Sequence, residues 1–423
     1  MKVYIAGVSG TGMGPLALMA KAAGMTVYGS DLSKGAIYDE LVKAGIKVQI
    51  GEQDGEFLRE CLKDGVDWYV HTSAMKENHP EVAEATMAGV KCTKRDDFTA
   101  YLVEKLGLKM VAVAGTHGKT TTTSMIVWAA LKLGLPVSYI VGTTLGFAPS
   151  GAYHEGDQYF VYEADEYDRN FLKFHPWLAV IPSISYDHPD IYATPEDYVA
   201  AFEQFKGQSE RVIERSENTA KWKEILPIMV RVGTFELAGE ARRADAMLAG
   251  MAIHQMAPEV SVDDIVTTLN EFPGVGRRFE RLCDGVYTDY AHHPEEIVAT
   301  IDVARDEAQL RELKGVVAVY QPHQNVRQHE VQEGYKDAFS GVEKLYWLPT
   351  YLTREDPELR VLEPEEFIED LALMDGVAEA AELSDGLFAE MMRWRDEGYL
   401  VLLMTAGPAD EWLKLKLSSE KKV

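Results

Sequence analysis

Residues 115–121 read Gly-Thr-His-Gly-Lys-Thr-Thr, and their types and spacing predict phosphate chemistry. An apolar run at 111–114 precedes them, and a helix is predicted over 120–132. A glycine loop between strand and helix directs backbone N–H groups and the helix N-terminus at one point, where phosphates bind. Lys119 would reach the β- and γ-phosphates and Thr120 would bind Mg²⁺. The loop is shorter than GxxxxGK[ST], because Val113 replaces its first glycine, and the alternative is a plain turn with a solvated lysine.

Two later strands would bring charged groups to the same sheet edge. The buried run at 159–162 ends in Glu163, with two further acids by 166, and the run at 178–182 leads to His188. A carboxylate at the carboxyl end of a parallel strand, beside a phosphate loop, is a typical Mg²⁺ ligand. The alternative for these acids is a solvated acidic turn. A lone histidine is more often structural, so the residues alone leave its role open.

A third group of polar residues follows three strand-like runs near the C-terminus. The runs are 285–288, 316–320 and 400–404, and each leads into polar or small residues at a predicted strand end. Open α/β sheets bind ligands at this edge. His292 and His293 are adjacent in an extended segment, so their side chains would point to opposite faces and would not share a metal.

The N-terminus predicts a nucleotide-binding turn of a different kind. A strand at 3–7 runs into a segment with glycines at 10, 12 and 14, and a second strand at 26–30 ends in Asp31. This pattern is similar to a dinucleotide-binding βαβ unit, whose acid meets a ribose. The irregular glycine spacing only weakly supports a nicotinamide cofactor, and a uridine diphosphate satisfies the same physics.

The chain's size and element order predict an α/β protein of two or three domains, with largely parallel sheets. Connections are expected at 101–109 and at 271–279. The second connection contains Arg277 and Arg278, which we interpret as an anion clamp rather than as surface arginines.

Composition restricts the partners. The chain has 423 residues, 68 acidic against 42 basic, and a formal net charge of −26, which disfavours nucleic acid. Three widely spaced cysteines indicate a reducing compartment. No apolar stretch is long enough for a membrane helix or a signal peptide, so we expect a cytoplasmic protein without membrane insertion that handles small molecules.

Taken together and in order, these motifs resemble those of the Mur ligases of bacterial peptidoglycan synthesis. The matching segments are Gly-Val-Ser-Gly-Thr-Gly-Met-Gly at 7–14, Gly-Ser-Asp at 29–31, the loop at 115–121, Glu-Ala-Asp-Glu at 163–166, Asp-His at 187–188, Gly-Arg-Arg-Phe at 276–279, Asp-Tyr-Ala-His-His-Pro at 289–294 and Gln-Pro-His at 321–323. The resemblance implies an N-terminal Rossmann-like UDP-sugar-binding domain (1–106), a shortened central P-loop ATPase-type domain (107–276) and a C-terminal Rossmann-like amino-acid-binding domain (277–423).

The alanine-adding members are the most similar branch. The resemblance implies that the lactyl carboxylate of UDP-N-acetylmuramate attacks the γ-phosphate of ATP, and that L-alanine then displaces phosphate from the acyl phosphate. Mg²⁺, Lys119 and an arginine would neutralise the repulsion between carboxylate and triphosphate. The implied cofactors are ATP and Mg²⁺, and the implied substrates are UDP-N-acetylmuramate and L-alanine. The expected oligomeric state is a monomer or a homodimer.

The resemblance also implies a set of site residues. The catalytic residues would be Lys119, His188, Arg278 and His292, and the metal ligands Thr120, Glu163 and His188. ATP would contact Gly115, Thr116, His117, Gly118, Lys119, Thr120, Thr121, Arg278 and Asp289. The UDP-sugar would contact Gly10, Thr11, Gly12, Met13, Asp31 and Ser73, and the amino acid Tyr290, His292, His323 and Arg327.

The sequence departs from the family pattern at four places. Gln324 stands where an arginine usually follows Gln-Pro-His, so one cationic contact to the amino acid would be lost. The adenine motif lacks its usual asparagines and histidine, the central domain is short between 205 and 237, and Pro182-Ser183 replaces a threonine-asparagine pair. At the adenine motif the chain instead carries Ala241, Arg242 and Asp245.

Three alternatives stay open at this point. One is a recycling ligase that adds a tripeptide to the same UDP-sugar, against which the 320–323 segment and Arg327 argue. Another is a degenerate, non-catalytic paralogue that binds a UDP-sugar or ATP, against which the retained charged groups argue. A nicotinamide oxidoreductase would have no use for the phosphate loop.

Overall fold

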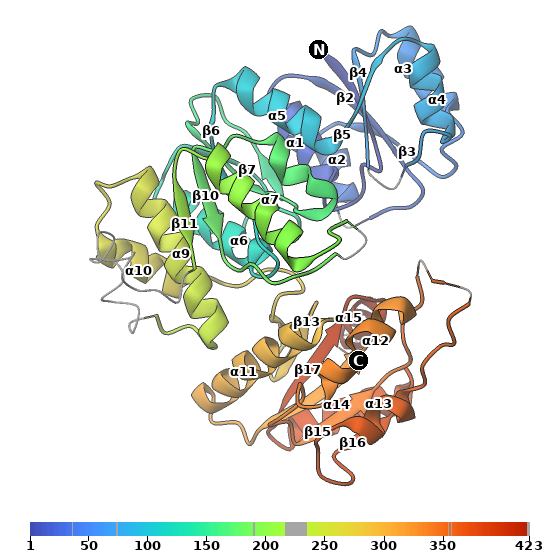
Figure 1. The fold of residues 1–423 in the computed structure, drawn as a ribbon, viewed down its shortest axis with the longest axis vertical. Coiled ribbons are helices and arrows are strands. Elements are labelled where there is room, and N and C mark those ends of the chain that lie inside the picture. The colour runs from blue at the N-terminus through green and yellow to red at the C-terminus, as the bar shows by residue number, and fades with distance from the viewer. Residues whose placement is uncertain are drawn as a thin grey trace. The chain divides into compact units, whose positions relative to one another are not determined.

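The computed structural model describes residues 1–35, 37–72, 75–188, 191–215, 235–353, 355–356 and 358–420. Its described part holds three sheets and divides into two compact units. Unit 1 comprises Met1–Phe235 and Ala244–Pro273, and unit 2 comprises Glu236–Arg243 and Gly274–Val423. Figure 1 shows helices beside each sheet, as expected for three α/β domains.

The first sheet of unit 1 has the strand order β3-β2-β1-β4-β5, with every pair parallel. Its strands are β1 (Lys2–Ala6), β2 (Thr26–Asp31), β3 (Lys47–Ile50), β4 (Trp68–His71) and β5 (Lys91–Lys94). The helices between them are α1 (Gly14–Ala22), α2 (Tyr38–Lys43), α3 (Glu56–Lys63), α4 (Pro80–Met87) and α5 (Arg95–Leu106). The strand order reverses between β1 and β4, and ligands bind at such a switch point beyond the carboxyl ends of the strands.

The second sheet of unit 1 has the order β11-β10-β6-β9-β7-β8 and is parallel except for the β7–β8 pair. Its strands are β6 (Lys109–Val113), β7 (Val137–Ile140), β8 (Gly151–Ala152), β9 (Tyr159–Glu163), β10 (Leu178–Ile181) and β11 (Val212–Glu214). The helices are α6 (Lys119–Lys132), the 3-10 helix η1 (Tyr167–Lys173), α7 (Pro195–Gln208), α9 (Glu240–Met256) and α10 (Val262–Asn270). β6 is central, so the loop that follows it meets the ends of β9 and β10.

The sheet of unit 2 has the order β12-β13-β17-β14-β15-β16, and only β12 is antiparallel to its neighbour. Its strands are β12 (Glu280–Cys283), β13 (Val286–Asp289), β14 (Val316–Gln321), β15 (Lys344–Trp347), β16 (Ala378–Ala380) and β17 (Leu400–Thr405). The helices are α11 (Pro294–Leu310), α12 (Asn325–Val331), η4 (Gln332–Tyr335), α13 (Pro364–Asp370), α14 (Asp385–Asp396) and α15 (Ala409–Glu420).

The cores explain why these strands read as apolar runs. One cluster of buried side chains in unit 1 includes residues of the first sheet, of α5 and of the second sheet. Parallel strands covered on both faces read as near-continuous hydrophobic segments, and β14 and β17 are buried along their whole length.

Most elements expected from the sequence are confirmed, with ends shifted by one or two residues. The helix expected at 120 begins one residue earlier, at Lys119. The connection expected at 101–109 was wrong, because α5 continues to Leu106 and β6 begins at Lys109. Phe98, Leu102 and Val103 of that helix are buried in the core. The second connection, 271–279, is confirmed between α10 and β12.

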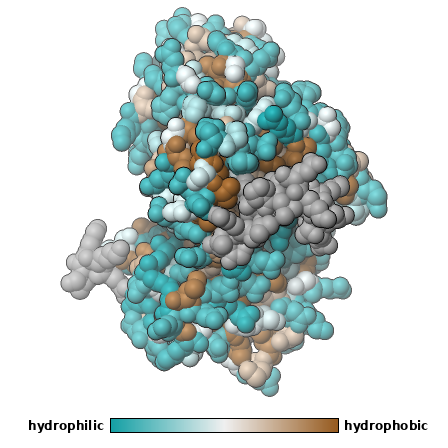
Figure 2. Space-filling view, turned by 90° about the vertical axis from the view of Figure 1, so that its left-hand side faces the viewer, coloured by the Kyte–Doolittle hydropathy of each residue, from teal (hydrophilic) through white to brown (hydrophobic). Residues whose placement is uncertain are grey.

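The domain limits 1–106, 107–276 and 277–423 stay a prediction, as does the shortening of the central domain, because residues 216–234 lie outside the described residues. Among the described residues, no helix is both long and apolar enough to cross a membrane. The face drawn in Figure 2 is mostly hydrophilic, with hydrophobic residues in scattered patches.

Candidate active site

The phosphate loop connects β6 to α6 in unit 1, and its backbone leaves no room for side chains at its glycines. Gly118 has a φ of +82°, and a Cβ there would lie 2.7 Å from Asp245 Oδ1 and 2.9 Å from Pro182 Cβ. A Cβ on Gly115 would lie 2.7 Å from the carbonyl oxygen of Ser183. Glycine is therefore required at both ends of the loop.

Neighbouring loops hold this backbone open at the start of α6. The Thr116 amide donates to Ser183 O (3.1 Å), and the His117 amide donates to Ser183 Oγ (2.8 Å). The Thr116 hydroxyl lies 2.8 Å from the Tyr198 hydroxyl. Within the described chain, the amides of the first helical turn (Lys119, Thr120, Thr121) donate no hydrogen bond. They remain available to an anion.

The Lys119 ammonium is held by three acceptors. It donates to Gly115 O (2.5 Å), Thr116 O (3.1 Å) and Glu166 Oε1 (2.9 Å). Burial alone would lower the pKa of Lys119, but Glu166, Asp165 and Glu163 outweigh it and raise the pKa above its ordinary value. Lys119 is thus a fixed positive charge beside the loop.

Thr120 and Glu163 form the pair expected of a metal site. The Thr120 hydroxyl donates to Glu163 Oε1 at 2.8 Å. The other carboxylate oxygen, Oε2, is buried and accepts no hydrogen bond from the described residues. A buried, unsatisfied carboxylate oxygen beside a hydroxyl is a donor set that suits Mg²⁺, which prefers oxygen ligands. The residues present therefore fit the ion that the loop sequence implies.

His188 lies beside Glu166. Its Nε2 is 3.8 Å from Glu166 Oε1 and 3.6 Å from Asp187 Oδ2, and its ring packs edge-on against Tyr167. Its φ of +59° is uncommon for a non-glycine residue and typical of functional turns. His188 thus lies beside the Lys119–Glu166 ion pair, and its metal role stays a prediction.

The predicted UDP loop follows β1 in the first sheet. Gly10 and Thr11 are exposed, Gly12 is half-buried and Met13 is buried at the start of α1. The carboxylate of Asp31, at the end of β2, accepts from the Ser9 amide at 2.8 Å and so fixes the start of this loop. Ser73 lies outside the described residues.

A buried carboxylate also lies behind this loop. The Gly7 and Val8 amides donate to Ser30 O (2.8 and 3.1 Å), and the Ser30 hydroxyl donates to Glu81 Oε2 (2.8 Å). Glu81 accepts further bonds from the hydroxyls of Tyr4 (2.7 Å) and Tyr69 (3.4 Å). All of these donors are neutral, and burial raises the pKa of Glu81.

In unit 2 the predicted amino-acid residues come together at the ends of β13 and β14. The His292 ring lies edge-on to Tyr290 (5.3 Å between centroids) and to His323 (6.0 Å). The Arg278 guanidinium lies over the Tyr290 ring at 5.1 Å. Burial lowers the pKa of His292, Glu296 opposes that shift, and Arg327 adds to it. The lowered pKa favours the neutral ring, whose Nδ1 lies 3.1 Å from Glu296 Oε2, and Arg278 and Arg327 are the cations that act on it.

Asp289 is engaged within unit 2. Its carboxylate accepts from the amides of Phe279 (2.6 Å) and Ala291 (2.8 Å), which fixes the linker against the end of β13. Burial raises its pKa, and Arg278 partly offsets this. The neighbouring Arg277 donates to Thr405 O at 2.7 Å. Contact of Asp289 with ATP stays a prediction.

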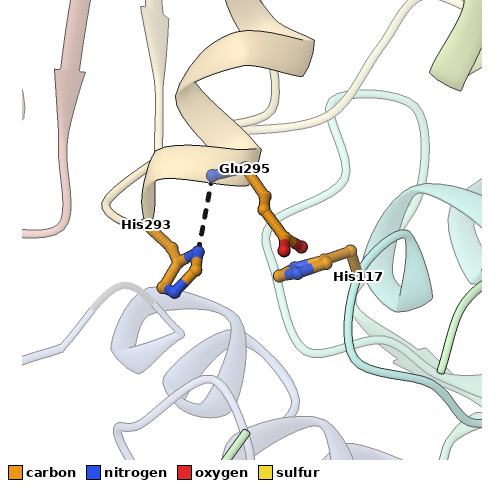
Figure 3. A group of neighbouring side chains, drawn as sticks. All are labelled: His117, His293 and Glu295. Atoms are coloured by element: carbon orange, nitrogen blue, oxygen red, sulfur yellow. Dashed lines mark hydrogen bonds between the residues drawn. The ribbon is translucent and has the colours of Figure 1, made fainter. Parts of the chain in front are cut away.

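The start of α11 explains the second histidine. His293 is the N-cap residue, and its Nδ1 accepts from the Glu295 amide at 3.4 Å (Figure 3). Gln324, at the departure from the family pattern, has a φ of +64°, and its backbone N–H donates to Tyr351 O at 3.0 Å. It is the N-cap residue of α12.

The altered adenine motif divides between the two units. Arg242 lies over the Phe279 ring at 6.0 Å, within unit 2. In the same unit, Asp306 of α11 accepts from the Gly239 amide (3.0 Å) and from Arg243 (3.2 Å). Asp245 belongs to unit 1, where it accepts from the Thr122 hydroxyl at 3.1 Å, beside the phosphate loop.

Sequence reasoning missed several residues that shape the phosphate loop. Glu166 stood in the recognised Glu-Ala-Asp-Glu motif and was passed over in favour of Glu163. Ser183 was noted only as a departure from the family pattern, yet it accepts bonds from two loop amides. No pattern in the sequence marks Tyr198, which reaches the loop from the first turn of α7.

Comparisons with known proteins follow the same division of the chain. Three family models match in order: the Mur ligase family, catalytic domain, at residues 2–105; the Mur ligase middle domain at 113–263; and the Mur ligase, glutamate ligase domain at 277–407.

Individual relatives match over most of their length. UDP-N-acetylmuramate–L-alanine ligase from Nocardioides sp. is 31% identical, over 96% of this chain and 93% of the relative. The enzyme of that name from Fusobacterium nucleatum is 30% identical, over 85% of each. The crystal structure of UDP-N-acetylmuramate–alanine ligase from Thermotoga maritima has a TM-score of 0.75 at 20% identity, over 100% of this chain and 99% of that one. The chain belongs to the Mur ligase family.

Proposed function

We propose that this chain is an ATP-dependent ligase that joins L-alanine to the lactyl carboxylate of UDP-N-acetylmuramate in peptidoglycan synthesis. The observation that carries the proposal is the charged cluster at the phosphate loop, where Lys119 faces Glu166 and Thr120 faces Glu163. The names of the relatives give the substrates, at 30–31% identity over most of the chain.

The cluster suits the first chemical step. The triphosphate would lie on the loop amides, and a lactyl carboxylate oxygen would attack the γ-phosphorus. ADP would leave, and the carboxylate would become an acyl phosphate. Lys119 would offset the charge that develops on the phosphoryl oxygens. Thr120 and Glu163 would hold Mg²⁺, which supplies further positive charge when bound.

The residues of unit 2 suit the second step. The α-amine of L-alanine would attack the acyl carbon, phosphate would leave, and the amine would lose a proton as the amide forms. A zwitterionic amino acid offers a carboxylate to cations and an amine to neutral acceptors. Arg278 and Arg327 provide the charge, and His292, whose pKa is lowered by burial, is an acceptor at neutral pH.

The alternatives have less support. The recycling ligase would share the phosphate-side residues, and the relatives reported above are named for alanine. A non-catalytic paralogue has no need of a buried Lys119 that is paired with Glu166, because burying charges is costly unless they serve a purpose.

Phosphate release tests the proposal directly. The full chain, ATP and MgCl₂ are combined with UDP-N-acetylmuramate and each of the twenty amino acids, or a cell-wall tripeptide. We expect release only when the UDP-sugar and L-alanine are both present. Release with the tripeptide alone would favour the recycling ligase. No release with any acceptor, despite nucleotide binding, would overturn the ligase assignment.

A further inference from the structure

The residues predicted to bind the UDP-sugar leave a charge imbalance. They are Gly10, Thr11, Gly12, Met13, Asp31 and Ser73, which include one acid and no base. A diphosphate carries at least two negative charges, and the chain as a whole has a formal charge of −26. Glycine amides and a helix start favour an anion, but in so acidic a chain a cation within contact distance is expected.

Arg95 is in the right place to be that cation. It is the first residue of α5 and follows β5, which lies beside β4 in the first sheet. The loop after β1 lies at the same edge, because all of these strands are parallel. A Cβ on Gly12 would lie only 2.9 Å from Arg95 Nη1. The guanidinium therefore lies directly against the glycine loop.

The guanidinium is anchored on one side and available on the other. Its Nε and Nη2 donate to Asp96 at 3.2 and 3.4 Å, and the Tyr162 hydroxyl donates to Asp96 at 2.6 Å. Nη1 donates no hydrogen bond to the described residues, although the side chain is only 24% exposed. Because Nε and Nη2 already hold the guanidinium in place, a ligand that binds Nη1 would cost the side chain little further conformational freedom.

The helix position gives an independent argument. A helix N-terminus carries partial positive charge, so a cation there is disfavoured, and the next two residues of α5 are acids, Asp96 and Asp97. Helix stability does not explain an arginine at this position. A bound anion would, because it would meet both the arginine and the glycine loop.

We propose that Arg95 binds the diphosphate of the UDP-sugar through Nη1, opposite Gly12. The inference rests on the proposed function, because it assumes a UDP-linked substrate. Arg95 Nη2 also lies 3.8 Å from Asp165, the neighbour of Glu166 in the phosphate-loop cluster. The same side chain thus connects the UDP loop to the cluster that faces ATP, within unit 1.

Binding measurements on the full chain test this. Calorimetry would measure the affinities for UDP-N-acetylmuramate, UDP-N-acetylglucosamine and UDP. Ligand-observed NMR would measure the affinity for uridine. In Arg95→Met we expect affinity for the three diphosphates to fall about 10- to 100-fold and that for uridine to stay within about twofold. Arg95→Lys should recover part of the loss, since it keeps the charge but not the fork. Arg59→Met, which removes the arginine that contacts Glu84 on α4, is the matched control and should bind all four ligands normally.

Other outcomes separate the hypotheses. If Arg95→Met binds UDP as the unaltered chain does, the assignment is wrong. A loss confined to UDP-N-acetylmuramate would mean that Arg95 contacts the lactyl carboxylate instead, which also overturns it. An equal loss for uridine and UDP, with a lower melting temperature, would make Arg95 structural. If the unaltered chain binds none of the diphosphates, the proposed function fails rather than the role of Arg95.

Discussion

Unit 1 contains two glycine loops, and a buried glutamate supports each in a different way. The loop after β1 is held by Ser30, whose hydroxyl donates to Glu81. The loop after β6 is held by Lys119, whose ammonium donates to Glu166. Both carboxylates have a raised pKa because they are buried. Their partners differ: among the described residues, the hydrogen-bond donors to Glu81 are neutral, whereas Glu166 accepts from a cation.

This difference indicates different roles. A carboxylate among hydroxyls and amides can be protonated without leaving an unpaired charge, so Glu81 is a structural support. A carboxylate paired with a buried lysine fixes the position of the ammonium. Removing either partner leaves the other as a buried, unpaired charge. The buried glutamate behind the loop after β6 is therefore paired with a charge, whereas the buried glutamate behind the loop after β1 is held by neutral hydrogen bonds. Four substitutions test that contrast.

Removing the cation should have the largest effect. In Lys119→Met we expect phosphate release to fall at least about 10³-fold, because the developing phosphoryl charge loses its fixed counter-charge. Binding of UDP-N-acetylmuramate, measured by calorimetry, should be retained. Lys132→Met, at the other end of the same helix, is the control and should keep full activity. Near-normal turnover in Lys119→Met would mean that the loop does not bind the triphosphate.

Removing the charge of Glu166 should have the next largest effect. Glu166→Gln keeps the shape but leaves Lys119 with weaker anchoring, so kcat/KM for ATP should fall about 10- to 100-fold. Glu166 is the group that raises the pKa of Lys119 most, so the pKa of Lys119 should be lower in this variant. Activity of the variant should therefore decline at a lower pH than activity of the unaltered chain. Identical alkaline limbs of the two pH–rate profiles would contradict this.

Sequence reasoning was accurate where a local pattern determines the structure. The strand, the glycine loop and the helix around Lys119 follow from an apolar run, two glycines and the following helix-forming residues. The positions of Glu163 and Asp289 at strand ends follow from the same periodicity. Each of these features depends on neighbours in the chain.

It was less accurate where the partner is distant in sequence. Glu166 contacts Lys119 across 47 residues, and the Tyr198 hydroxyl contacts Thr116 across 82. Neither pairing follows from spacing, because it depends on which strands are neighbours in the sheet. The connection expected at 101–109 failed for a related reason. The segment continues a helix, and one face of that helix packs into a core that includes residues of both sheets.

A backbone substitution in the phosphate loop should have a smaller effect on activity. In Gly118→Ala the new Cβ would meet Asp245 and Pro182, and φ is +82°. We expect kcat/KM for ATP to fall about tenfold, because the loop amides shift, and the free energy of unfolding to fall by about 1–2 kcal/mol. The control is Gly134→Ala, beyond the other end of α6, where φ is +70° but no atom lies within 4 Å. It should lose stability alone. Equal losses of activity in the two variants would contradict a specific role of Gly118.

The smallest effect on activity should come from Glu81→Gln, which acts on the UDP loop. We expect turnover to stay within about threefold, and the free energy of unfolding at pH 5 to fall by about 1 kcal/mol as hydrogen bonds are rearranged.

The pH dependence of this variant is more informative. Because the pKa of Glu81 is raised above its ordinary value of 4.5, the folded chain binds that proton more tightly than the unfolded chain. Stability that comes from this group is therefore present below pH 4.5 and lost as pH rises through the raised pKa. Glutamine does not titrate, so the deficit of Glu81→Gln relative to the unaltered chain should shrink between pH 5 and pH 8. Carboxylates with a lowered pKa, such as Glu366, change stability with pH in the opposite direction. Their effect is the same in both chains, so it cancels in this difference.

Urea unfolding of both chains at each pH measures the difference in stability. A deficit that grows with pH would mean that Glu81 is stabilised as a carboxylate, and the contrast between the two loops would then disappear.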